Sequence, residues 1–121
     1  MSSIQESLND LRRASGVKGC VLLTDDGLVV AQALDNRFRD DVIAGLASYL
    51  VMTTNRSLAE AELGRFDQLT VHATHGKAVL VGLENSFLVV LLSQFADLDA
   101  CRGEIQGAVQ RLRRMSRMSK D

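Results

Sequence analysis

The sequence predicts an α/β (α+β) fold: one five-stranded antiparallel sheet covered by helices on both faces, in the order α-β-β-α-β-β-β-α. Three observations support this. Apolar residues at helical spacing alternate with short β-rich runs, and the turns between consecutive strands are too short for a parallel crossover. No linker, repeat or low-complexity stretch interrupts the 121 residues. We therefore expect residues 1–121 to form a single domain, a length that can bury one core without staples.

The N-terminal part is predicted to form an amphipathic helix followed by a β-hairpin. Ser3 and Glu6 have the spacing of a capping box, and Gly16 is expected to end the helix as its C′ residue. Val17 to Thr24 and Leu28 to Ala33 are rich in β-forming residues. The Asp-Asp-Gly turn between them supplies the positive φ angles that a tight hairpin needs.

A long helix is predicted from Asp40 to Leu63. Asp40 and Asp41 suit its first turn because carboxylates there meet unpaired N–H groups and the positive end of the dipole. Gly64 is its expected stop.

The C-terminal half is predicted to contain a meander of three strands and a last helix. The strands are Phe66 to Thr74, Lys77 to Leu83 and Phe87 to Ser93. Asp97 is the expected N-cap of the helix, whose apolar face comprises Leu98, Cys101, Ile105, Ala108, Leu112 and Met115.

The middle helix carries no charged residue from Val42 to Asn55. Its apolar arc covers about half the circumference, and the rest consists mainly of small or uncharged residues: Ala44, Gly45, Ser48, Met52, Asn55 and Ala59. Leaving Val42, Leu46 and Tyr49 in water would forfeit roughly 1.5–3 kcal/mol each. We therefore predict homodimerisation through this helix. A different protein partner and deeper burial within the monomer are the alternatives.

The strand after this helix supports the same prediction. Phe66 to Thr74 contains no proline or lysine, the residues that usually protect an exposed strand edge. The predicted dimer interface therefore comprises Val42, Leu46, Tyr49, Thr53, Leu69 and Val71. An edge that faces solvent and is protected only by its twist is the alternative.

Composition excludes several classes of partner. The net charge of −1 creates no overall field toward nucleic acid or an acidic membrane. The longest uncharged run is too short to span a bilayer, and no signal peptide is recognisable, so a cytoplasmic location is expected.

Cys20 and Cys101 match no metal or redox spacing and are expected to be buried free thiols.

No motif for catalysis is present. His72 and His75 are predicted to lie on opposite faces of one strand, so they cannot share a metal ion. Gly76-Lys77-Ala78 lacks the earlier glycine and the following Ser or Thr of a phosphate loop. We predict no catalytic residue, no cofactor and no metal, and hence a protein that is not an enzyme.

Several segments together carry a family resemblance: Gly16 to Ala31, Leu63-Gly64, His75 to Val81, Phe87 to Leu91 and the arginine-rich last helix. They resemble the Roadblock/LC7 domain family, and within it the bacterial MglB-like branch. The resemblance implies a profilin-like sheet with strand order 2-1-5-4-3, dimerised through the middle helix and third strand. It also implies a small Ras-like GTPase as partner.

In that branch the dimer is thought to reposition the catalytic residues of the GTPase by contact, without an active site of its own. From its position on the polar rim of the middle helix, Arg56 is the first candidate for a charged partner contact, with Glu60 and Glu62 beside it. The resemblance leaves two other functions open. One is a non-catalytic adaptor or scaffold of a GTPase or motor complex, and the other is a small-ligand sensor, for which the apolar strands offer few polar groups.

Overall fold

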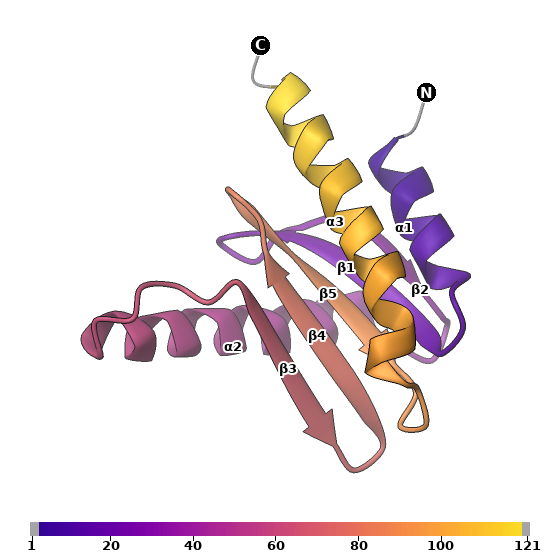
Figure 1. The fold of residues 1–121 in the computed structure, drawn as a ribbon, viewed down its shortest axis with the longest axis horizontal. Helices are drawn as coiled ribbons and strands as arrows, with labels where there is room; N and C mark the ends of the chain where they lie inside the picture. Colours follow the sequence, from indigo (N-terminus) through magenta and orange to yellow (C-terminus); the bar gives the residue numbers. More distant parts are fainter. Residues whose placement is uncertain (1–2, 120–121) are drawn as a thin grey trace.

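The computed structural model describes residues 3–119, with side chains up to residue 115. Within this range the elements follow the predicted order (Figure 1). Their bounds are α1 (Ile4–Arg12), β1 (Val17–Thr24), β2 (Val29–Leu34), α2 (Asp40–Glu60), β3 (Gln68–Ala73), β4 (Gly76–Gly82), β5 (Ser86–Leu92) and α3 (Leu98–Ser119).

The strands form one sheet in the order β2-β1-β5-β4-β3, with every neighbouring pair antiparallel. This is the order that the family resemblance implied. β1 and β3 each follow a helix in the chain, but they occupy different positions in the sheet. β1 is an internal strand, whereas β3 is an edge strand. The other edge is β2.

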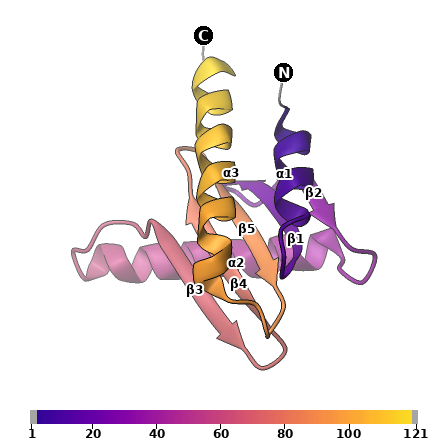
Figure 2. The ribbon, with the colours of Figure 1, turned by 45° about the vertical axis from the view of Figure 1, so that its right-hand side comes forward.

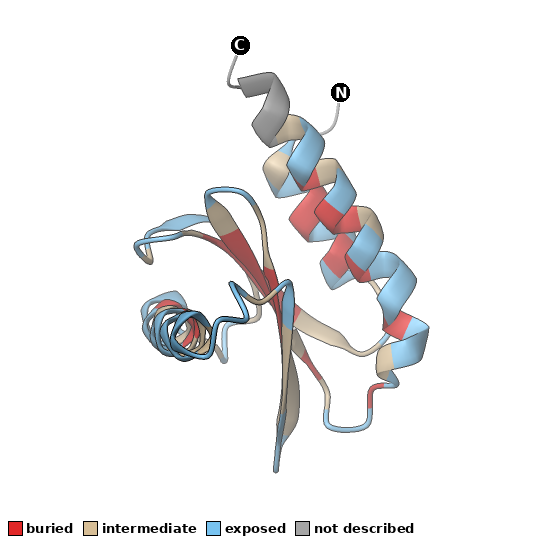
Figure 3. Cartoon of the chain, turned by 60° about the vertical axis from the view of Figure 1, so that its left-hand side comes forward, coloured by how far each residue is buried: buried red, intermediate tan, exposed pale blue. Residues whose placement is uncertain are grey.

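Helices cover both faces of the sheet, with α1 and α3 on one face and α2 on the other (Figure 3). Successive side chains of β5 point to opposite faces of the sheet, so this strand contributes to both cores. Leu88 and Val90 face α1 and α3, whereas Phe87 and Val89 face α2. The core on the α1/α3 side also contains Leu8, Leu11, Cys20, Leu22, Ala33, Val79, Val81, Leu92, Ala96, Cys101, Ile105, Ala108, Val109 and Leu112.

The core under α2 is smaller. It joins Ala44, Ala47 and Val51 of the helix to Val21, Leu23, Leu80, Phe87 and Val89 of the sheet. Ala44 thus lies in the core, although its position in the sequence placed it outside the apolar arc. In Figures 1 and 2 the C-terminal part of α2 projects beyond the sheet, so this part has little of the chain to pack against.

Both predicted N-caps are present. The Ser3 hydroxyl accepts a hydrogen bond from the Glu6 N–H at 3.1 Å, and a carboxylate oxygen of Asp97 accepts one from the Asp99 N–H at 3.0 Å. Asp40 and Asp41 lie in the first turn of α2, as predicted. The thiols of Cys20 and Cys101 are free and buried, also as predicted.

Both predicted helix C-termini were wrong by a few residues. The first helix ends at Arg12 with Arg13 as its C-cap, and Gly16 lies further along, at φ +87°. A Cβ atom on Gly16 would lie 2.8 Å from the Cβ of Ala96. The absence of a side chain at Gly16 therefore allows both the turn and the close approach of the loop before α3. The sequence pattern could not distinguish this role from that of a helix stop.

The middle helix ends at Glu60 and not at Leu63. The N–H of Leu63 bonds the carbonyl of Leu58 at 2.8 Å, and the N–H of Glu62 bonds that of Ala59 at 3.0 Å. These two bonds are those of a Schellman motif, which places Glu62 at the left-handed C′ position with φ +62°. A glutamate therefore occupies the place where glycine was expected.

Candidate interaction surface

The outer side of α2 carries a line of residues at alternating spacings of four and three. Its members, which we call the outer line, are Val42, Leu46, Tyr49, Thr53, Arg56 and Glu60, all exposed. The exposed fraction is 55% for Val42, 58% for Leu46 and 65% for Tyr49. Met52, beside this line, is 55% exposed. The chain therefore does not cover these side chains itself, and monomer burial is excluded as an explanation for the uncharged helix.

The inner side of α2 explains why the helix lies in this orientation. Ala44 and Ala47 are small, so the helix axis can approach the sheet closely. Close approach is also required at Gly27, where a Cβ atom would lie 2.5 Å from the Ser48 hydroxyl oxygen. That hydroxyl is buried and has no hydrogen-bond partner. With Ala44 and Ala47 toward the sheet, the opposite side of the helix remains exposed.

The edge strand β3 follows α2 in the chain and forms one edge of the sheet. Leu69 packs at the border of the core under α2. Val71, two residues further along the strand, points to the same face of the sheet, and both side chains are half-buried. In a hairpin whose loop has two residues, the flanking pair Ala73 and Gly76 is hydrogen-bonded. Hydrogen-bonded and non-hydrogen-bonded pairs alternate along an antiparallel ladder. The backbone N–H and C=O groups of Gln68, Thr70 and His72 therefore point away from β4. These three residues present the free edge of the sheet.

The opposite edge, β2, is closed by side chains. The Gln5 amide nitrogen donates to the Gln32 carbonyl at 2.9 Å, and the Leu34 N–H donates to the Gln32 side-chain oxygen at 2.8 Å. These bonds occupy edge groups that could otherwise pair with another strand. Thus the edge beside α1 is capped, whereas no such side-chain bond is recorded on the β3 edge among the described residues.

The three candidate partner contacts do not form one group. Arg56 and Glu60 continue the outer line toward the projecting end of α2, and both are exposed. Glu62 is exposed too, but it belongs to the turn that ends the helix. Sequence reasoning missed Met52 as part of the exposed apolar surface, and it missed Phe95, which is 86% exposed in the loop before α3. The signal for Met52 was its place in the uncharged run.

The described residues contain no group of three or more His, Cys, Asp and Glu side chains that could hold a metal ion.

Burial raises the pKa of the Cys20 thiol to about 12, and its Sγ lies 3.3 Å from the Leu8 carbonyl oxygen, to which it donates. A thiol with this pKa is protonated near neutral pH and is a poor nucleophile. Across residues 3–119 no helix is long and apolar enough to cross a membrane.

Solved structures with the same fold include MglB of Myxococcus xanthus, with a TM-score of 0.88, 15% identity and 95% coverage of both chains. MglB in a tetrameric arrangement matches with a TM-score of 0.82 and 17% identity, over 98% of this chain and 93% of that chain. Profilin II of Acanthamoeba castellanii matches with a TM-score of 0.62 and 10% identity, over 94% of this chain and 99% of that chain. The fold is thus the profilin-like fold of MglB.

Sequence comparison reaches further groups of organisms. The uncharacterized protein MJ1340 of the archaeon Methanocaldococcus jannaschii is 28% identical over 112 residues, which are 93% of this chain and 98% of that protein. The likeness is therefore not confined to bacteria, and the bacterial branch stays a prediction. The family model of the Roadblock/LC7 domain matches residues 3–92, from the cap of α1 to the end of β5. This chain belongs to the Roadblock/LC7 domain family.

Proposed function

We propose that this protein is a homodimer that regulates a small Ras-like GTPase by direct contact, without an active site of its own. Membership of the Roadblock/LC7 family and the MglB-like fold support this proposal. The single observation that carries it is the exposed apolar part of the outer line, because Val42, Leu46 and Tyr49 have no cover within the chain.

A second copy is the occupant that the molecule fits best. The apolar outer line and the free β3 edge are both uncovered within the chain, and we propose that one twofold axis serves both. Burying each large apolar side chain contributes roughly 1.5–3 kcal/mol to the free energy of association. In a twofold interface each residue contributes twice, once from each subunit. The tetrameric arrangement known for MglB is a further indication that this fold self-associates. The proposed interface contains Val42, Leu46, Tyr49, Thr53, Leu69 and Val71.

We also propose one register for the pairing of two β3 edges. Only Gln68, Thr70 and His72 point their backbone groups outward, so an antiparallel pairing uses all three when the axis passes through Thr70. Thr70 then faces Thr70 of the partner subunit, and Gln68 faces the partner's His72. Shifting the axis by one residue would lose part of this pairing.

The first experiment is the solution mass by size-exclusion chromatography with light scattering. We expect twice the chain mass of 13.2 kDa. Introducing Leu46→Glu and Tyr49→Glu together should give a monomer, because two carboxylates would be buried against apolar groups. Phe95→Glu is the matched control, since Phe95 is exposed but lies far from α2 in the chain. A wild-type monomer at all concentrations would contradict the dimer.

The second experiment tests the register by cross-linking. Thr70→Cys should form a disulfide between subunits under mild oxidation, because its Cα atoms would lie about 5.5 Å apart across a hydrogen-bonded pair. Gln68→Cys is the control: its own copy would lie four residues away along the partner strand, out of reach. Equal cross-linking of the two variants would rule out this register.

The third experiment concerns the partner. Small Ras-like GTPases of the same organism are incubated with saturating dimer, and single-turnover GTP hydrolysis is measured. We expect an acceleration of about tenfold or more, which corresponds to about 1.4 kcal/mol of barrier lowering. Arg56→Glu should abolish the effect while the dimer persists, since Arg56, Glu60 and Glu62 are the proposed partner contacts. Binding without acceleration would support the adaptor alternative, and absence of binding would refute both.

A further inference from the structure

A hollow of about 480 Å³ opens at the end of the sheet where β5 leads into α3. Its walls come from the loop after α1, the loop before α3 and the first two turns of α3. None of its lining residues belongs to the proposed dimer interface. The inference drawn from it goes beyond the proposed function and does not depend on it.

Phe95 lines this hollow and is the most exposed large apolar side chain among the described residues, at 86%. A phenylalanine ring gains stability when it leaves water, so a ring held in solvent is costly unless a partner covers it. Aromatic side chains are also enriched at the centres of protein interfaces. The ring of Phe95 therefore has the properties of an anchor for a partner.

Hydrogen bonds on both sides fix the loop that carries Phe95. The Phe95 N–H donates to the Ser93 hydroxyl at 3.2 Å, and the Ala96 N–H donates to the Ser93 carbonyl at 3.0 Å. The Ser93 N–H bonds the Gly16 carbonyl at 2.9 Å, and Lys77 Nζ bonds the Ala96 carbonyl at 2.6 Å. Because the backbone is already ordered, a partner that covers the ring loses little entropy in fixing it.

The buried part of the lining is apolar. Ala96 and Cys101 are 9% and 4% exposed, and Ala14 is half-buried. The Cys101 thiol donates to the Ser15 carbonyl at 3.2 Å, which holds the loop after α1 against α3. The hollow can thus take the aliphatic part of a side chain.

Two carboxylates border the hollow along α3. Asp97, Ala100 and Glu104 follow one another at spacings of three and four, so they lie on one side of the helix. Asp97 and Glu104 are both exposed, and their positions are separated by about 10 Å along the helix axis. A ligand that reaches both carboxylates must therefore be elongated.

No cation neutralises these carboxylates within the described part of the chain. The lining contains no Lys, Arg or His, and neither carboxylate forms an ion pair with a described side chain. Arg13, next to Ala14 in the chain, pairs with Asp10 at 2.6 Å, and neither of these two residues lines the hollow. The surface beside Phe95 is therefore negative.

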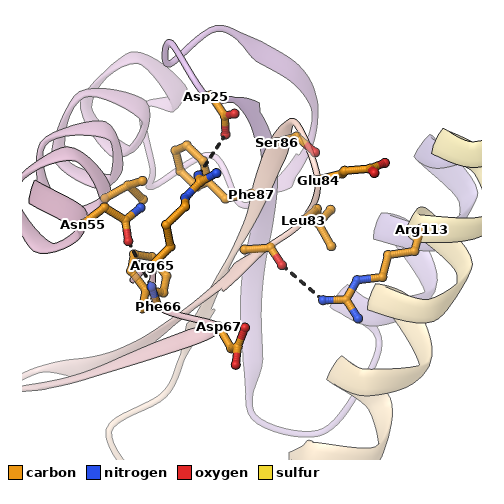
Figure 4. Close-up of a pocket in the computed structure, with 12 residues that line it drawn as sticks. Asp25, Asn55, Arg65, Phe66, Asp67, Leu83, Glu84, Ser86, Phe87 and Arg113 are labelled. Atoms are coloured by element: carbon orange, nitrogen blue, oxygen red, sulfur yellow. Dashed lines mark hydrogen bonds and ion pairs between the residues drawn. The ribbon is translucent and has the colours of Figure 1, made fainter. Parts of the chain in front are cut away.

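The hollow at the opposite end of the sheet shows the contrast (Figure 4). There Arg65 is directed toward Asp25, with 3.9 Å between the closest charged atoms, and Arg113 donates to the Gly82 carbonyl at 3.2 Å. The cations of that hollow have partners in the chain itself. Charge is matched internally at one end of the sheet and left unmatched at the other.

We propose that the surface around Phe95 binds a basic segment of another polypeptide, with an arginine or lysine side chain over the ring and cations beside Asp97 and Glu104. The face of an aromatic ring attracts a cation, and the two carboxylates add to this attraction. The distance between the carboxylates matches a stretch of chain and is too large for one small cation to bridge.

Three capped heptapeptides separate the effect of charge from that of shape. They differ only at two positions, which hold arginine, its neutral isostere citrulline, or glutamate. Calorimetry, together with amide shifts of Ser15, Gly16 and Phe95 in NMR spectra of the full chain, should show the arginine peptide binding about tenfold tighter than the citrulline peptide. This advantage should decrease as salt is added.

Several outcomes of this titration would overturn the proposal. They are equal binding of the arginine and citrulline peptides, tighter binding of the glutamate peptide, amide shifts confined to other regions, and absence of binding at millimolar peptide.

Variants test the contribution of the ring. Phe95→Leu keeps an apolar side chain and removes the aromatic face, so it should weaken binding of the arginine peptide by about threefold and that of the citrulline peptide by less. An equal loss for the two peptides would show that the ring contributes only apolar area, which would contradict the proposed contact with a cation.

Variants of the carboxylates test the contribution of charge. Glu104→Gln and Asp97→Asn should each weaken binding of the arginine peptide by about threefold and reduce its dependence on salt. Asparagine caps helices as well as aspartate does, so Asp97→Asn keeps the start of α3. Asp99→Asn is the matched control, because Asp99 is exposed on the same helix but pairs with Arg102 at 2.8 Å outside the hollow. A loss in the control equal to that in Glu104→Gln would refute the assignment.

The solution mass separates a foreign polypeptide from a second copy of this chain. Light scattering of the wild type and of Phe95→Leu should give the same mass over a range of concentrations. A larger assembly of the wild type that Phe95→Leu no longer forms would assign this surface to contacts between copies, and the proposal would then be wrong.

Discussion

The two helical layers of this protein cover the same sheet in different ways. On one face, α1 and α3 bury apolar stripes and turn charged residues such as Asp10 and Arg102 outward. On the other face, α2 buries only Ala44, Ala47 and Val51 and turns larger apolar side chains outward. The first layer is complete within the chain. The second leaves exposed the kind of surface that proteins normally bury, which is why we assign recognition to α2.

The largest expected difference between the layers is in core truncation. Leu88→Ala, in the α1/α3 core, should lower the free energy of unfolding by about 2–5 kcal/mol because Leu88 is fully buried. Val42→Ala, made in the monomeric Leu46→Glu/Tyr49→Glu background, should change it by less than about 0.5 kcal/mol. Urea denaturation measures both values. A large loss at Val42 would show that α2 packs more fully in the monomer than the structure indicates.

The α1/α3 core should also make stability sensitive to alkaline pH through Cys20. Burial raises the pKa of the Cys20 thiol from its ordinary value of 9.0 to about 12, so above pH 9 the folded state keeps a proton that the unfolded state releases. The free energy of unfolding should therefore fall as pH rises from 9 toward 12, by at most about 1.4 kcal/mol per unit from this group.

Cys20→Ala supplies the control for this pH effect. The variant loses packing, so it should be less stable than wild type at pH 7.5, where the thiol is protonated. The gap between the two proteins should narrow above pH 9. A constant gap would indicate that Cys20 does not contribute to the alkaline loss.

On the α2 side, Ser48→Ala should preserve or raise stability. The Ser48 hydroxyl is buried without a partner, and removing an unsatisfied polar group of this kind is worth about 1 kcal/mol. Thermal unfolding should therefore give an equal or higher Tm. Ser7→Ala is the matched change in the other layer: Ser7 accepts a hydrogen bond from Arg111 at 3.3 Å, so its loss should destabilise. The opposite order would contradict this account.

The smallest expected effect is at the end of α2. Glu62 adopts φ +62°, so Glu62→Gly should stabilise the protein by about 0.5–1 kcal/mol by relieving left-handed strain. Glu60→Gly, inside the helix, should destabilise by a similar amount. If Glu62→Gly weakens GTPase binding while raising the Tm, the glutamate would be retained for its contact with the partner.

The sequence by itself determined the order of the elements, the caps at Ser3 and Asp97, and the apolar nature of α2. These features depend on local periodicity and on side chains bonding the nearest backbone groups, so neighbours in the chain suffice to specify them. The exposure of Val42, Leu46 and Tyr49 was also foreseeable, because a chain of this length has too little material to cover a second side of the helix.

Only the tertiary structure decided which part of α2 touches the sheet, where this helix ends, and which distant side chains meet. Ala44 is in the core because the helix turns this side toward Val21, Leu80 and the other sheet residues beneath it. Ser7 of α1 and Arg111 of α3 are 104 positions apart in the chain yet share a hydrogen bond of 3.3 Å. Contacts of this kind depend on strand order and on helix rotation, which arise from packing between distant segments and leave no periodic signal in the sequence.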